Sequence, residues 1–451
     1  MSERGSFGSK LGVVLATAGS AVGLGNVWRF PYMVGENGGA AFILIYFGCI
    51  VLLGIPGMLG EFVIGRHAQA NAARVYDKLS GGKPWKLVGY MGILSATVIL
   101  GFYAVVAGWC LQYLFASIAG QVNGDAEYVR QYFVSFSSDA LKPVLWGIGF
   151  VLLTHFVIVR GVRKGIERIS KVLMPLLLLL LVIIVVASCL LPGALEGIRF
   201  LFMPDFSKLS PSILVEALGQ AFFSLSLGTA CLCTYASYFS RQTNLLSSAL
   251  QIALLDTFIA ILAGLMIFPV AASVGVSPDS GPSLIFITLP NVFSQAFATV
   301  PVLGWVISVM FYALLVFAAL TSTISMHEIG TVFFSEEFHL PRRRAAWIIT
   351  LTCSVICVFC ALSVGAYPDL QVLGLQVMDF CDKLTANVMM PVGGLLTCLF
   401  VGWCISRRTV YDEFTNGGTT NTGMFAVWLF AVRYACPTCI ILILLHQLGI
   451  L

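Results

Sequence analysis

The sequence has 451 residues, of which 59% are hydrophobic and only 10% are charged, and its mean hydropathy is +0.94. Soluble domains contain about 25% charged residues, so this composition excludes a soluble globular protein. The 25 Lys and Arg against 21 Asp and Glu give a net charge of +4, which is too little for a surface that follows nucleic-acid phosphates. We therefore expect a protein whose surroundings are the lipid bilayer and which has no nucleic-acid partner.

Eleven apolar runs are long enough to cross a bilayer, which takes about 20 helical residues. Only helices or closed barrels satisfy their backbone hydrogen bonds in lipid, and these runs lack the alternation of barrel strands. We therefore expect an all-α polytopic membrane protein with eleven transmembrane helices. The expected spans are residues 10–34, 40–65, 87–119, 144–160, 169–191, 212–239, 245–272, 301–334, 345–365, 371–404 and 423–449.

The loops differ sharply in their content of basic residues. Most of the 25 Lys and Arg fall in the N-terminal segment and in every second loop after it, which by the positive-inside rule places the N-terminus in the cytoplasm. With an odd number of spans, the C-terminus is then extracytoplasmic. The Pro-rich stretch 273–300 lies outside and is expected to cap the bundle. The first run lacks a cleavage site, so it is not a signal peptide.

Two of the runs carry small and polar residues at membrane depth: residues 19–26 (GSAVGLGN) in the first and residues 223–229 (FSLSLGT) in the sixth. A broken helix leaves carbonyls that coordinate cations and N–H groups that bind anions. For any single Gly, close helix packing is the alternative explanation. Because the two runs are five spans apart, we expect inverted five-helix repeats, 10–191 and 212–404, within one transporter domain over residues 1–451.

Several motifs resemble the neurotransmitter:sodium symporter family, in the same order along nearly the whole chain. The most specific is GSAVGLGNVWRFP at residues 19–31. The others are residues 36–39 (ENGG), 219–228 (GQAFFSLSLG), 235–238 (YASY), 286–295 (FITLPNVFSQ), 319–322 (ALTS) and 378–380 (MDF). Eleven spans, rather than the twelve of the animal members, are typical of the bacterial amino-acid transporters of this family. The resemblance implies a location in the bacterial inner membrane.

The resemblance also implies two sodium sites and no organic cofactor. The first site would use Ala21, Asn26, Ser224 and Asp256, together with the carboxylate of the substrate. Such a shared ligand gives a physical reason for coupling, because ion and amino acid each supply part of the other's binding energy. The second site would use the backbone carbonyls of Gly19, Val22 and Ala318 and the hydroxyls of Thr321 and Ser322.

Asp256 stands where better-known relatives have Asn, and it adds a formal charge beside the first ion. In the animal members a bound chloride supplies negative charge nearby. Tyr46, Gln220 and Ser224 resemble parts of that anion pocket, but Ala260 offers no hydroxyl. Our hypothesis is that Asp256 replaces chloride, with proton exchange on the return step as a further option. The alternative is a paired structural carboxylate.

The substrate site implied by the resemblance uses the backbone at both helix breaks. The carboxylate would meet N–H groups at Ala21 and Gly25 and the hydroxyl of Tyr103, because half-helix N-termini attract anions. The ammonium would meet carbonyls near residues 223–226. Monoamine transporters carry Asp at the position of Ala21, so its absence indicates an α-amino acid. The side-chain pocket would be formed by Ile99, Phe223, Ser226, Thr229, Ser322 and Met326, with Ser224 beside it.

Two gates and one flexible helix complete the expected transport cycle. The outer gate would pair Arg29 with Asp379, above Tyr103 and Phe223. The inner gate would pair Arg4 with Glu336, for which an ordinary surface ion pair is the alternative. Two further residues, Phe7 and Tyr238, would anchor the N-terminal segment. Finally, Gly165 and Pro175 would let the fifth span unwind, unless they simply mark a helix N-terminus.

We therefore interpret the chain as a sodium symporter that imports large aliphatic or aromatic L-amino acids, independently of chloride. The rival interpretations are an amino-acid sensor on the same scaffold and a symporter for a different small amino acid. A channel would need a continuous polar stripe, which is absent from the sequence. An enzyme is not expected, because the five His are dispersed without metal-like spacing and the 13 Cys lie mostly in apolar runs.

Overall fold

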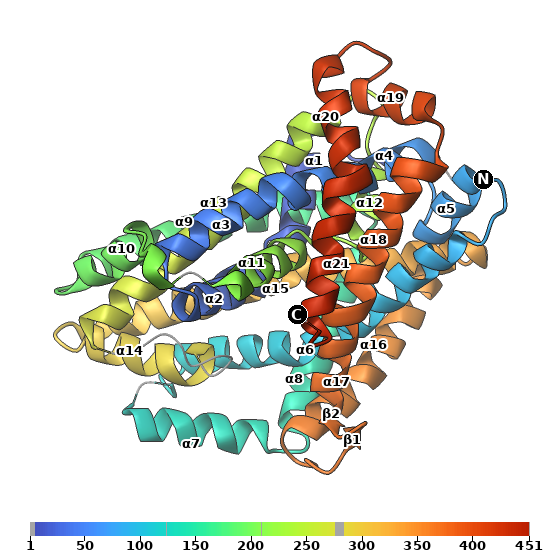
Figure 1. Ribbon diagram of the computed structural model, residues 1–451. Coiled ribbons are helices and arrows are strands. Elements are labelled where there is room, and N and C mark those ends of the chain that lie inside the picture. The colour runs from blue at the N-terminus through green and yellow to red at the C-terminus, as the bar shows by residue number, and fades with distance from the viewer. Residues whose placement is uncertain (1–4, 123, 209, 276–283, 451) are drawn as a thin grey trace.

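The computed structural model describes residues 5–122, 124–208, 210–275 and 284–450, and these ranges are almost entirely helical (Figure 1). The longer helices are α1 (Lys10–Ala21), α3 (Ala40–Cys49), α4 (Ile55–Ala68), α6 (Lys86–Ile118), α8 (Lys142–Val159), α9 (Arg168–Cys189), α11 (Pro211–Ser224), α13 (Leu245–Ser273), α15 (Pro301–Glu337), α16 (Arg342–Val364), α18 (Met390–Leu399) and α21 (Cys436–Gln447). The shorter helices are α2 (Phe30–Glu36), α5 (Ala72–Ser80), α7 (Ala126–Ser137), α10 (Ala194–Phe202), α12 (Cys231–Ala236), α14 (Leu289–Ala296), α17 (Val377–Lys383), α19 (Arg407–Thr415) and α20 (Phe425–Phe430). Strands β1 (Gln371–Val372) and β2 (Leu375–Gln376) form one antiparallel hairpin.

Nine helical segments of the described chain are long and apolar enough to cross a membrane. Several are built from two helices joined by a π-helical turn, as α3 and α4 are joined by residues 50–54. Their limits agree with the expected spans to within a few residues, except that the fifth span begins at Val162 rather than at residue 169 and that the tenth does not begin at residue 371. There the chain first forms the β1–β2 hairpin, since Leu373 and Gly374 both have positive φ, which a two-residue hairpin turn requires. The helical segment therefore begins at Val377 rather than at residue 371.

The first and sixth expected spans are interrupted where their small residues lie. After α1, residues 22–24 turn the chain by 55° before helix resumes at Gly25, and counting this bent pair as one span gives ten among the described residues. In the sixth run, α11 ends at Ser224 and α12 begins at Cys231, so neither piece is long enough to span alone. Residues 226, 228 and 230 between them have positive φ.

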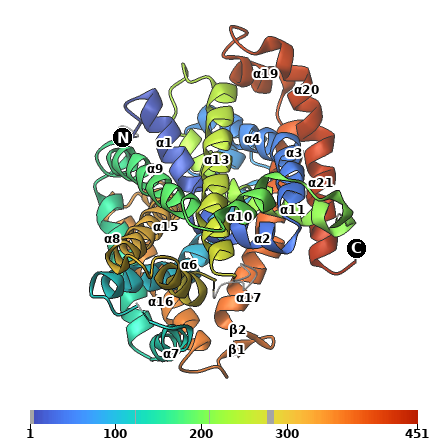
Figure 2. The same cartoon turned by 90° about the vertical axis from the view of Figure 1, so that its left-hand side faces the viewer.

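Both interruptions lie in the interior of the bundle. Helix α1 packs against α9, α13 and α15, and α12 packs against α4 and α15; Figure 2 shows α1, α13 and α15 side by side. Val22, Leu24, Leu225 and Leu227, which flank the interruptions, are at most 2% exposed. Backbone that leaves the helical path at membrane depth is tolerated only where protein or a cavity surrounds it, and the bundle provides such surroundings.

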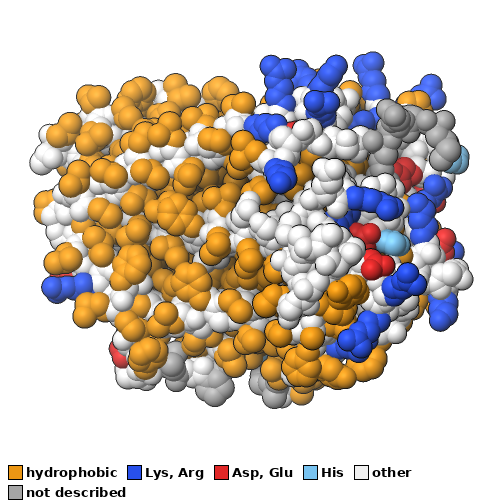
Figure 3. Space-filling view, turned by 90° about the horizontal axis from the view of Figure 1, so that it is seen from above, with side chains coloured by type: hydrophobic (Ala, Val, Ile, Leu, Met, Phe, Trp, Pro, Cys, Tyr) orange, Lys and Arg blue, Asp and Glu red, His pale blue; other side chains and the backbone are white. Residues whose placement is uncertain are grey.

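The exterior has the two kinds of surface that a multi-pass membrane protein needs. Figure 3 shows a broad hydrophobic face, and Lys and Arg side chains gathered at one end of the molecule. Large apolar side chains such as Leu94, Leu254 and Leu351 are more than half exposed. Such side chains would be an aggregation liability in water, but they are the expected surface in contact with lipid.

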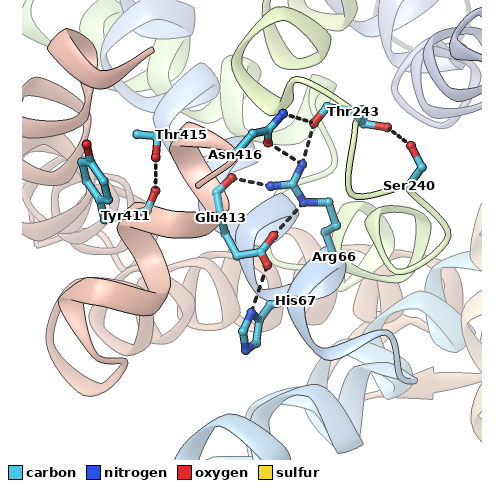
Figure 4. A network of polar contacts seen from close by, with 8 residues as sticks. All are labelled: Arg66, His67, Ser240, Thr243, Tyr411, Glu413, Thr415 and Asn416. Carbon is cyan, nitrogen blue, oxygen red and sulfur yellow. Dashed lines mark hydrogen bonds and ion pairs between the residues drawn. The ribbon is translucent and has the colours of Figure 1, made fainter. Parts of the chain in front are cut away.

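A buried ion pair holds α19 against the end of α4 (Figure 4). Arg66 and Glu413, whose side chains are 2% and 13% exposed, are joined at 2.7 Å. Arg66 also donates to the carbonyl of Thr243 at 2.5 Å and to Asn416 Oδ1 at 3.0 Å. Burial by itself raises the pKa of Glu413, but a hydrogen bond from His67 and the charge of Arg66 outweigh it, so the net pKa lies below its ordinary value. Three separate segments thus meet at one guanidinium.

We predict that Glu413→Ala lowers the stability of the protein by about 3 kcal/mol, because it leaves a buried guanidinium without its carboxylate. The measurement is the apparent Tm in detergent, followed by intrinsic fluorescence. Asp412→Ala is the matched control, because Asp412 is half exposed and its ion pair with Arg408 is long, at 4.0 Å. Since the pKa of Glu413 is lowered, its contribution is present at neutral pH and is lost as pH falls through the folded-state pKa. Equal Tm values for both variants at neutral pH contradict the prediction.

Candidate functional site

One cavity lies between the two interrupted helices, and every residue expected to contact the substrate lines it. Its free space, measured for the centre of a water molecule, is about 70 Å³. Since roughly 10–15 Å³ of such space holds one water, the cavity admits an organic molecule of several heavy atoms. The expected residues on its wall are Ala21, Gly25, Ile99, Tyr103, Phe223, Ser224, Ser226, Thr229, Ser322 and Met326. The wall also includes Ser20, Gly23, Phe102, Cys231, Ser325 and Met390, which the sequence did not single out.

Polar groups gather where the first interruption meets this cavity. The N–H of Leu24 donates to the Tyr103 hydroxyl at 3.1 Å. A Cβ at Gly23 would lie 2.5 Å from Ser322 Oγ, and one at Gly25 would lie 3.2 Å from the Phe223 ring. Glycine at these two positions therefore lets the backbone approach the cavity closely. Gly25, the first residue of the next helical segment, lies on the cavity wall, and the positive end of a helix favours an anion.

The side chains of the expected first sodium site form one buried cluster. Asn26 Nδ2 donates to Asp256 Oδ1 at 2.7 Å and lies 3.3 Å from Ser224 Oγ. Ser224 Oγ donates to the other oxygen of Asp256 at 2.8 Å. The N–H of Gly23 donates to Asn26 Oδ1 at 3.1 Å, so this cluster also fixes the turn between α1 and the next helical segment. Asp256 is 0% exposed and has polar partners on both carboxylate oxygens.

The groups that resemble an anion pocket surround the same carboxylate. The Tyr46 hydroxyl and both polar atoms of the Gln220 amide are buried without a hydrogen-bond partner among the described residues. Ala260, one turn along α13 from Asp256, is also fully buried. The acidic side chain at this place is that of Asp256, which is 0% exposed and accepts hydrogen bonds from Asn26 and Ser224.

The oxygen atoms of the expected second sodium site converge at the end of α1. Thr321 Oγ1 and Ser322 Oγ each lie 3.4 Å from the carbonyl oxygen of Val22, and Thr321 Oγ1 lies 3.0 Å from that of Ala318. A Cβ built on Gly19 would be 3.2 Å from Thr321 Cβ. Cations of the size of Ca²⁺ hold oxygen ligands at 2.3–2.6 Å, so neighbouring ligands are about 3.3–3.7 Å apart. The two 3.4 Å separations fall in this range, whereas the 3.0 Å separation is a hydrogen bond that the Thr321 hydroxyl donates to the Ala318 carbonyl.

The outer ion pair differs from the expectation. Among the described residues, no ion pair within 4.0 Å joins Arg29 to Asp379, which is exposed. The Arg29 guanidinium lies over the Phe223 ring at 4.3 Å, and the acidic charge that acts on it is that of Asp382. The two acids are three residues apart, about one turn of α17, and Asp379 points toward solvent. The expected stacking of Arg29 above Phe223 is present, but its expected carboxylate partner is not.

At the opposite end of the cavity, the N-terminal segment packs onto the end of the sixth run. Phe7 contacts the rings of Tyr235, Tyr238 and Phe239 at centroid distances of 5.9–6.3 Å. The Tyr238 hydroxyl donates to Glu328 at 2.7 Å. Phe7 and Tyr238 therefore lie together as expected.

The expected inner ion pair cannot be placed in full, because Arg4 lies outside the described residues. Its expected partner, Glu336, accepts hydrogen bonds from the backbone and side-chain nitrogens of Asn71 at 2.8 and 3.1 Å. A second ion pair that the sequence analysis missed joins Arg342 to Glu328. Glu328 is 0% exposed, and its position at the end of a long apolar run was the signal that could have identified it.

Residues Gly165 and Pro175 both lie in helical backbone. Gly165 belongs to a π-helical turn over residues 162–167, and a Cβ there would be 2.2 Å from the carbonyl oxygen of Val157. Pro175 lies inside α9, seven residues after its start, rather than at a helix N-terminus. A proline inside a helix removes one hydrogen bond and weakens the preceding turn. Helix α9 is therefore continuous in this structure, although it contains the proline that we expected to weaken it.

Glu61 is the functional candidate that the sequence analysis overlooked. Its two carboxylate oxygens accept the N–H groups of Gly228 and Cys233 at 2.8 and 3.2 Å. It is 3% exposed and lies on α4. These N–H groups lose their helical partners at the second interruption, and Glu61 satisfies them. An acidic residue within the second apolar run was the available signal, because a charge at membrane depth rarely lacks a role.

No group of three or more His, Cys, Asp or Glu side chains capable of holding a metal ion occurs within the described ranges. His155 and His327 both lie near the Thr350 hydroxyl, at 2.8 and 2.9 Å, and His155 also packs on Trp347. These imidazoles connect α8, α15 and α16 and have polar partners in the packed interior.

Comparison with known proteins gives consistent similarities over the whole chain. The sequence model of the sodium:neurotransmitter symporter family matches residues 4–126 and 124–450. An uncharacterized sodium-dependent transporter of Bacillus subtilis, YhdH, is 39% identical over 449 residues, covering 99% of this chain and 98% of that protein. An uncharacterized sodium-dependent transporter of Haemophilus influenzae is 34% identical, with the same coverage. The crystal structure of MhsT in complex with L-phenylalanine superposes with a TM-score of 0.89 and 41% identity, covering 98% of this chain and 100% of MhsT.

We predict that a substitution at Gly228 lowers the stability of the protein, whereas one at Ala230, two residues further on, leaves it nearly unchanged. Gly228 has φ +78°, and a Cβ there would lie 2.1 Å from the carbonyl oxygen of Met390, so Gly228→Ala should cost about 2 kcal/mol or more. Ala230 also has a positive φ, of 61°. Ala230→Gly should be nearly neutral, because relief of about 1 kcal/mol of backbone strain offsets about 0.8 kcal/mol for the lost buried methyl. Apparent Tm values measure both, and a stable Gly228→Ala protein contradicts the assignment.

Proposed function

The chain belongs to the sodium:neurotransmitter symporter family, and from this premise we propose that it imports hydrophobic L-amino acids together with sodium by alternating access. The observation that carries the proposal is the cavity between the two interrupted helices. Backbone of both interruptions and several side-chain hydroxyls lie on its wall beside apolar side chains. A free amino acid has the same division, with a charged end and, in the large aliphatic and aromatic members, an apolar side chain.

The polar end of the amino acid would bind at the helix ends. Its carboxylate would meet the N–H groups at Ala21 and Gly25 and the hydroxyl of Tyr103, at the positive end of the helical segment that begins at Gly25. Its ammonium would meet carbonyl oxygens where α11 ends, at Phe223, Ser224 and Ser226. Ala21 offers no carboxylate to replace that of the substrate, which favours an α-amino acid over a monoamine.

The side chain of the amino acid would occupy the apolar part of the cavity. Ile99, Phe102, Met326 and Met390 provide carbon and sulfur surface there, and Met adapts its shape to different ligands. Thr229 provides a smaller wall than an aromatic residue would. The crystal structure of the similar protein MhsT is that of its complex with L-phenylalanine. This supports an aromatic or large aliphatic substrate for this chain too.

Sodium would bind at two places beside the first interruption. The first ion would be held by Ala21, Asn26, Ser224, Asp256 and the carboxylate of the amino acid. Because the carboxylate of the amino acid is itself a ligand of this ion, the ion and the amino acid would each strengthen binding of the other. The second ion would be held by Gly19, Val22, Ala318, Thr321 and Ser322, and would tie α1 to α15. Loss of that ion would release the contact, which is how ion and conformation would be coupled.

The movement would involve both ends of the cavity. Arg29 with Phe223 would close the outer end, and the N-terminal segment with Phe7, Tyr238 and Glu336 would close the inner end. Unwinding between Gly165 and Pro175 would open a water path to the second ion. The arrangement would act as two inverted repeats, 10–191 and 212–404, with 423–449 as an additional helix. The proposed setting is the bacterial inner membrane, with the N-terminus in the cytoplasm and the C-terminus outside.

The test is uptake of labelled L-phenylalanine into proteoliposomes under an inward sodium gradient, with a panel of twenty amino acids as competitors. We expect concentrative uptake that disappears without sodium, and competition by Leu, Ile, Tyr and Trp but not by Gly or charged amino acids. Sodium-dependent binding without uptake would instead support a sensor on the same scaffold. Competition led by Gly or Ala would identify a symporter for a different, small amino acid and would overturn the substrate class.

We further propose that Asp256 supplies the negative charge that chloride supplies in animal relatives. Replacing chloride with gluconate should therefore leave uptake unchanged. Asp256→Asn keeps the size of the side chain but removes its charge, so it should raise the sodium concentration needed for half-maximal uptake about tenfold or more. Asp256→Glu is the control, because it retains the negative charge at this position. Uptake by the wild type that falls with chloride removal contradicts this proposal.

A further inference from the structure

A cationic cavity separate from the substrate cavity lies at the start of α9. It has a volume of about 400 Å³ and is lined by Gly8, Arg163, Lys164, Glu167, Arg168 and Lys171. Four of these six residues are cationic and one is acidic. The cavity lies between the N-terminal segment and the π-helical turn of residues 162–167, and none of its residues lines the substrate cavity.

The one acidic side chain in this cavity, Glu167, already has hydrogen-bond donors on both carboxylate oxygens. Glu167 accepts the N–H of Gly8 at 2.6 Å and the hydroxyl of Ser9 at 3.1 Å, and it is paired with Lys171 at 2.6 Å. Arg163, Lys164 and Arg168 are exposed, and none of them has a carboxylate partner within 4.0 Å in the described part of the chain. Three uncompensated cations therefore surround one cavity, and the ligand that complements them is an anion with several oxygens.

The surface next to the cavity identifies the kind of anion. Along α9, exposed apolar side chains recur every three or four residues and form one stripe that starts one turn after Arg168. Only 33% of the apolar window of this span is buried, the lowest share of the nine. The stripe consists of Val172, Leu176, Leu179, Ile183 and Val186, which are 36–58% exposed. A stripe of this kind in a transmembrane helix faces the acyl chains of lipid.

We propose that the cavity binds the headgroup of an anionic phospholipid whose acyl chains lie along the apolar stripe of α9. The phosphate would meet Arg163, Lys164 and Arg168, and the chains would continue from it into the bilayer. A soluble anion would use the cationic cavity but not the stripe, whereas a lipid uses both. Basic pockets between membrane helices bind anionic headgroups on the side of the membrane that carries most Lys and Arg, and Figure 3 shows these residues gathered next to the hydrophobic face.

The bound headgroup would touch the N-terminal segment directly, since Gly8 belongs to the cavity wall. A Cβ at Gly8 would lie 2.8 Å from Arg163 Nε, so this segment and the cationic side chains are in contact. The proposal concerns binding and holds whether or not the chain transports amino acids. Its test therefore measures lipid retention and does not use uptake.

The experiment compares the wild type with the triple variant Arg163→Gln, Lys164→Gln, Arg168→Gln. Lys171 is kept because it pairs with Glu167. The control is Arg343→Gln, Arg344→Gln, Arg408→Gln, which removes the same charge from exposed cations elsewhere. Each protein is purified from nanodiscs containing phosphatidylcholine and phosphatidylglycerol, and bound lipid is identified by native mass spectrometry. Elution as a single species from a sizing column verifies folding, and the single variant Arg168→Gln replaces the triple variant if that fails.

We expect the wild type and the control to retain phosphatidylglycerol, and the site variant to retain about tenfold less, because each cation near the membrane surface strengthens binding of anionic lipid. Glycerol 3-phosphate, which has the headgroup chemistry without acyl chains, should not displace the lipid. Equal retention by the site variant and the control overturns the proposal. Displacement by millimolar glycerol 3-phosphate or inorganic phosphate also overturns it, because that result identifies a site for soluble anions.

Discussion

The structure depends on satisfying backbone groups that leave the helical path inside a bilayer. Each unpaired N–H or carbonyl at that depth is costly because no water reaches it. Here Tyr103 accepts the N–H of Leu24, Asn26 accepts that of Gly23, and Glu61 accepts those of Gly228 and Cys233. The groups that remain line the cavity, where a ligand can take the place of water.

The same constraint explains why so few charges occur at membrane depth and why each has a partner. Asp256 is held by Asn26 and Ser224, and Glu328 is paired with Arg342. Removing one member of such a pair is costly, whereas the intact pair contributes little net stability. Under the proposed alternating access, pairs near this balance would let a small change in ion or substrate binding shift the equilibrium between the two ends.

The N-terminal segment shows how surface and interior are connected. Phe7 packs against Tyr235 and Tyr238 at the end of the sixth run, and Gly8 and Ser9 are held by Glu167 at the start of the fifth span. Release of this segment would therefore uncover the inner end of the cavity and loosen the turn before α9. A lipid headgroup in the neighbouring cationic cavity would lie where these contacts meet.

The sequence by itself determined the positions of nearly all the apolar helices and ten of the sixteen residues on the cavity wall, because run length, small residues at membrane depth and motif order are one-dimensional properties. Only the tertiary structure decided which polar groups meet. Asp382 rather than Asp379 acts on Arg29, Glu61 satisfies the second interruption, and Arg66 meets Glu413 across 347 residues of chain. Such pairings depend on how each helix is rotated about its axis and how far it is displaced along it. A change of one residue in that register turns a side chain by about 100°, and the hydrophobic pattern of a helix apolar on all sides does not specify it.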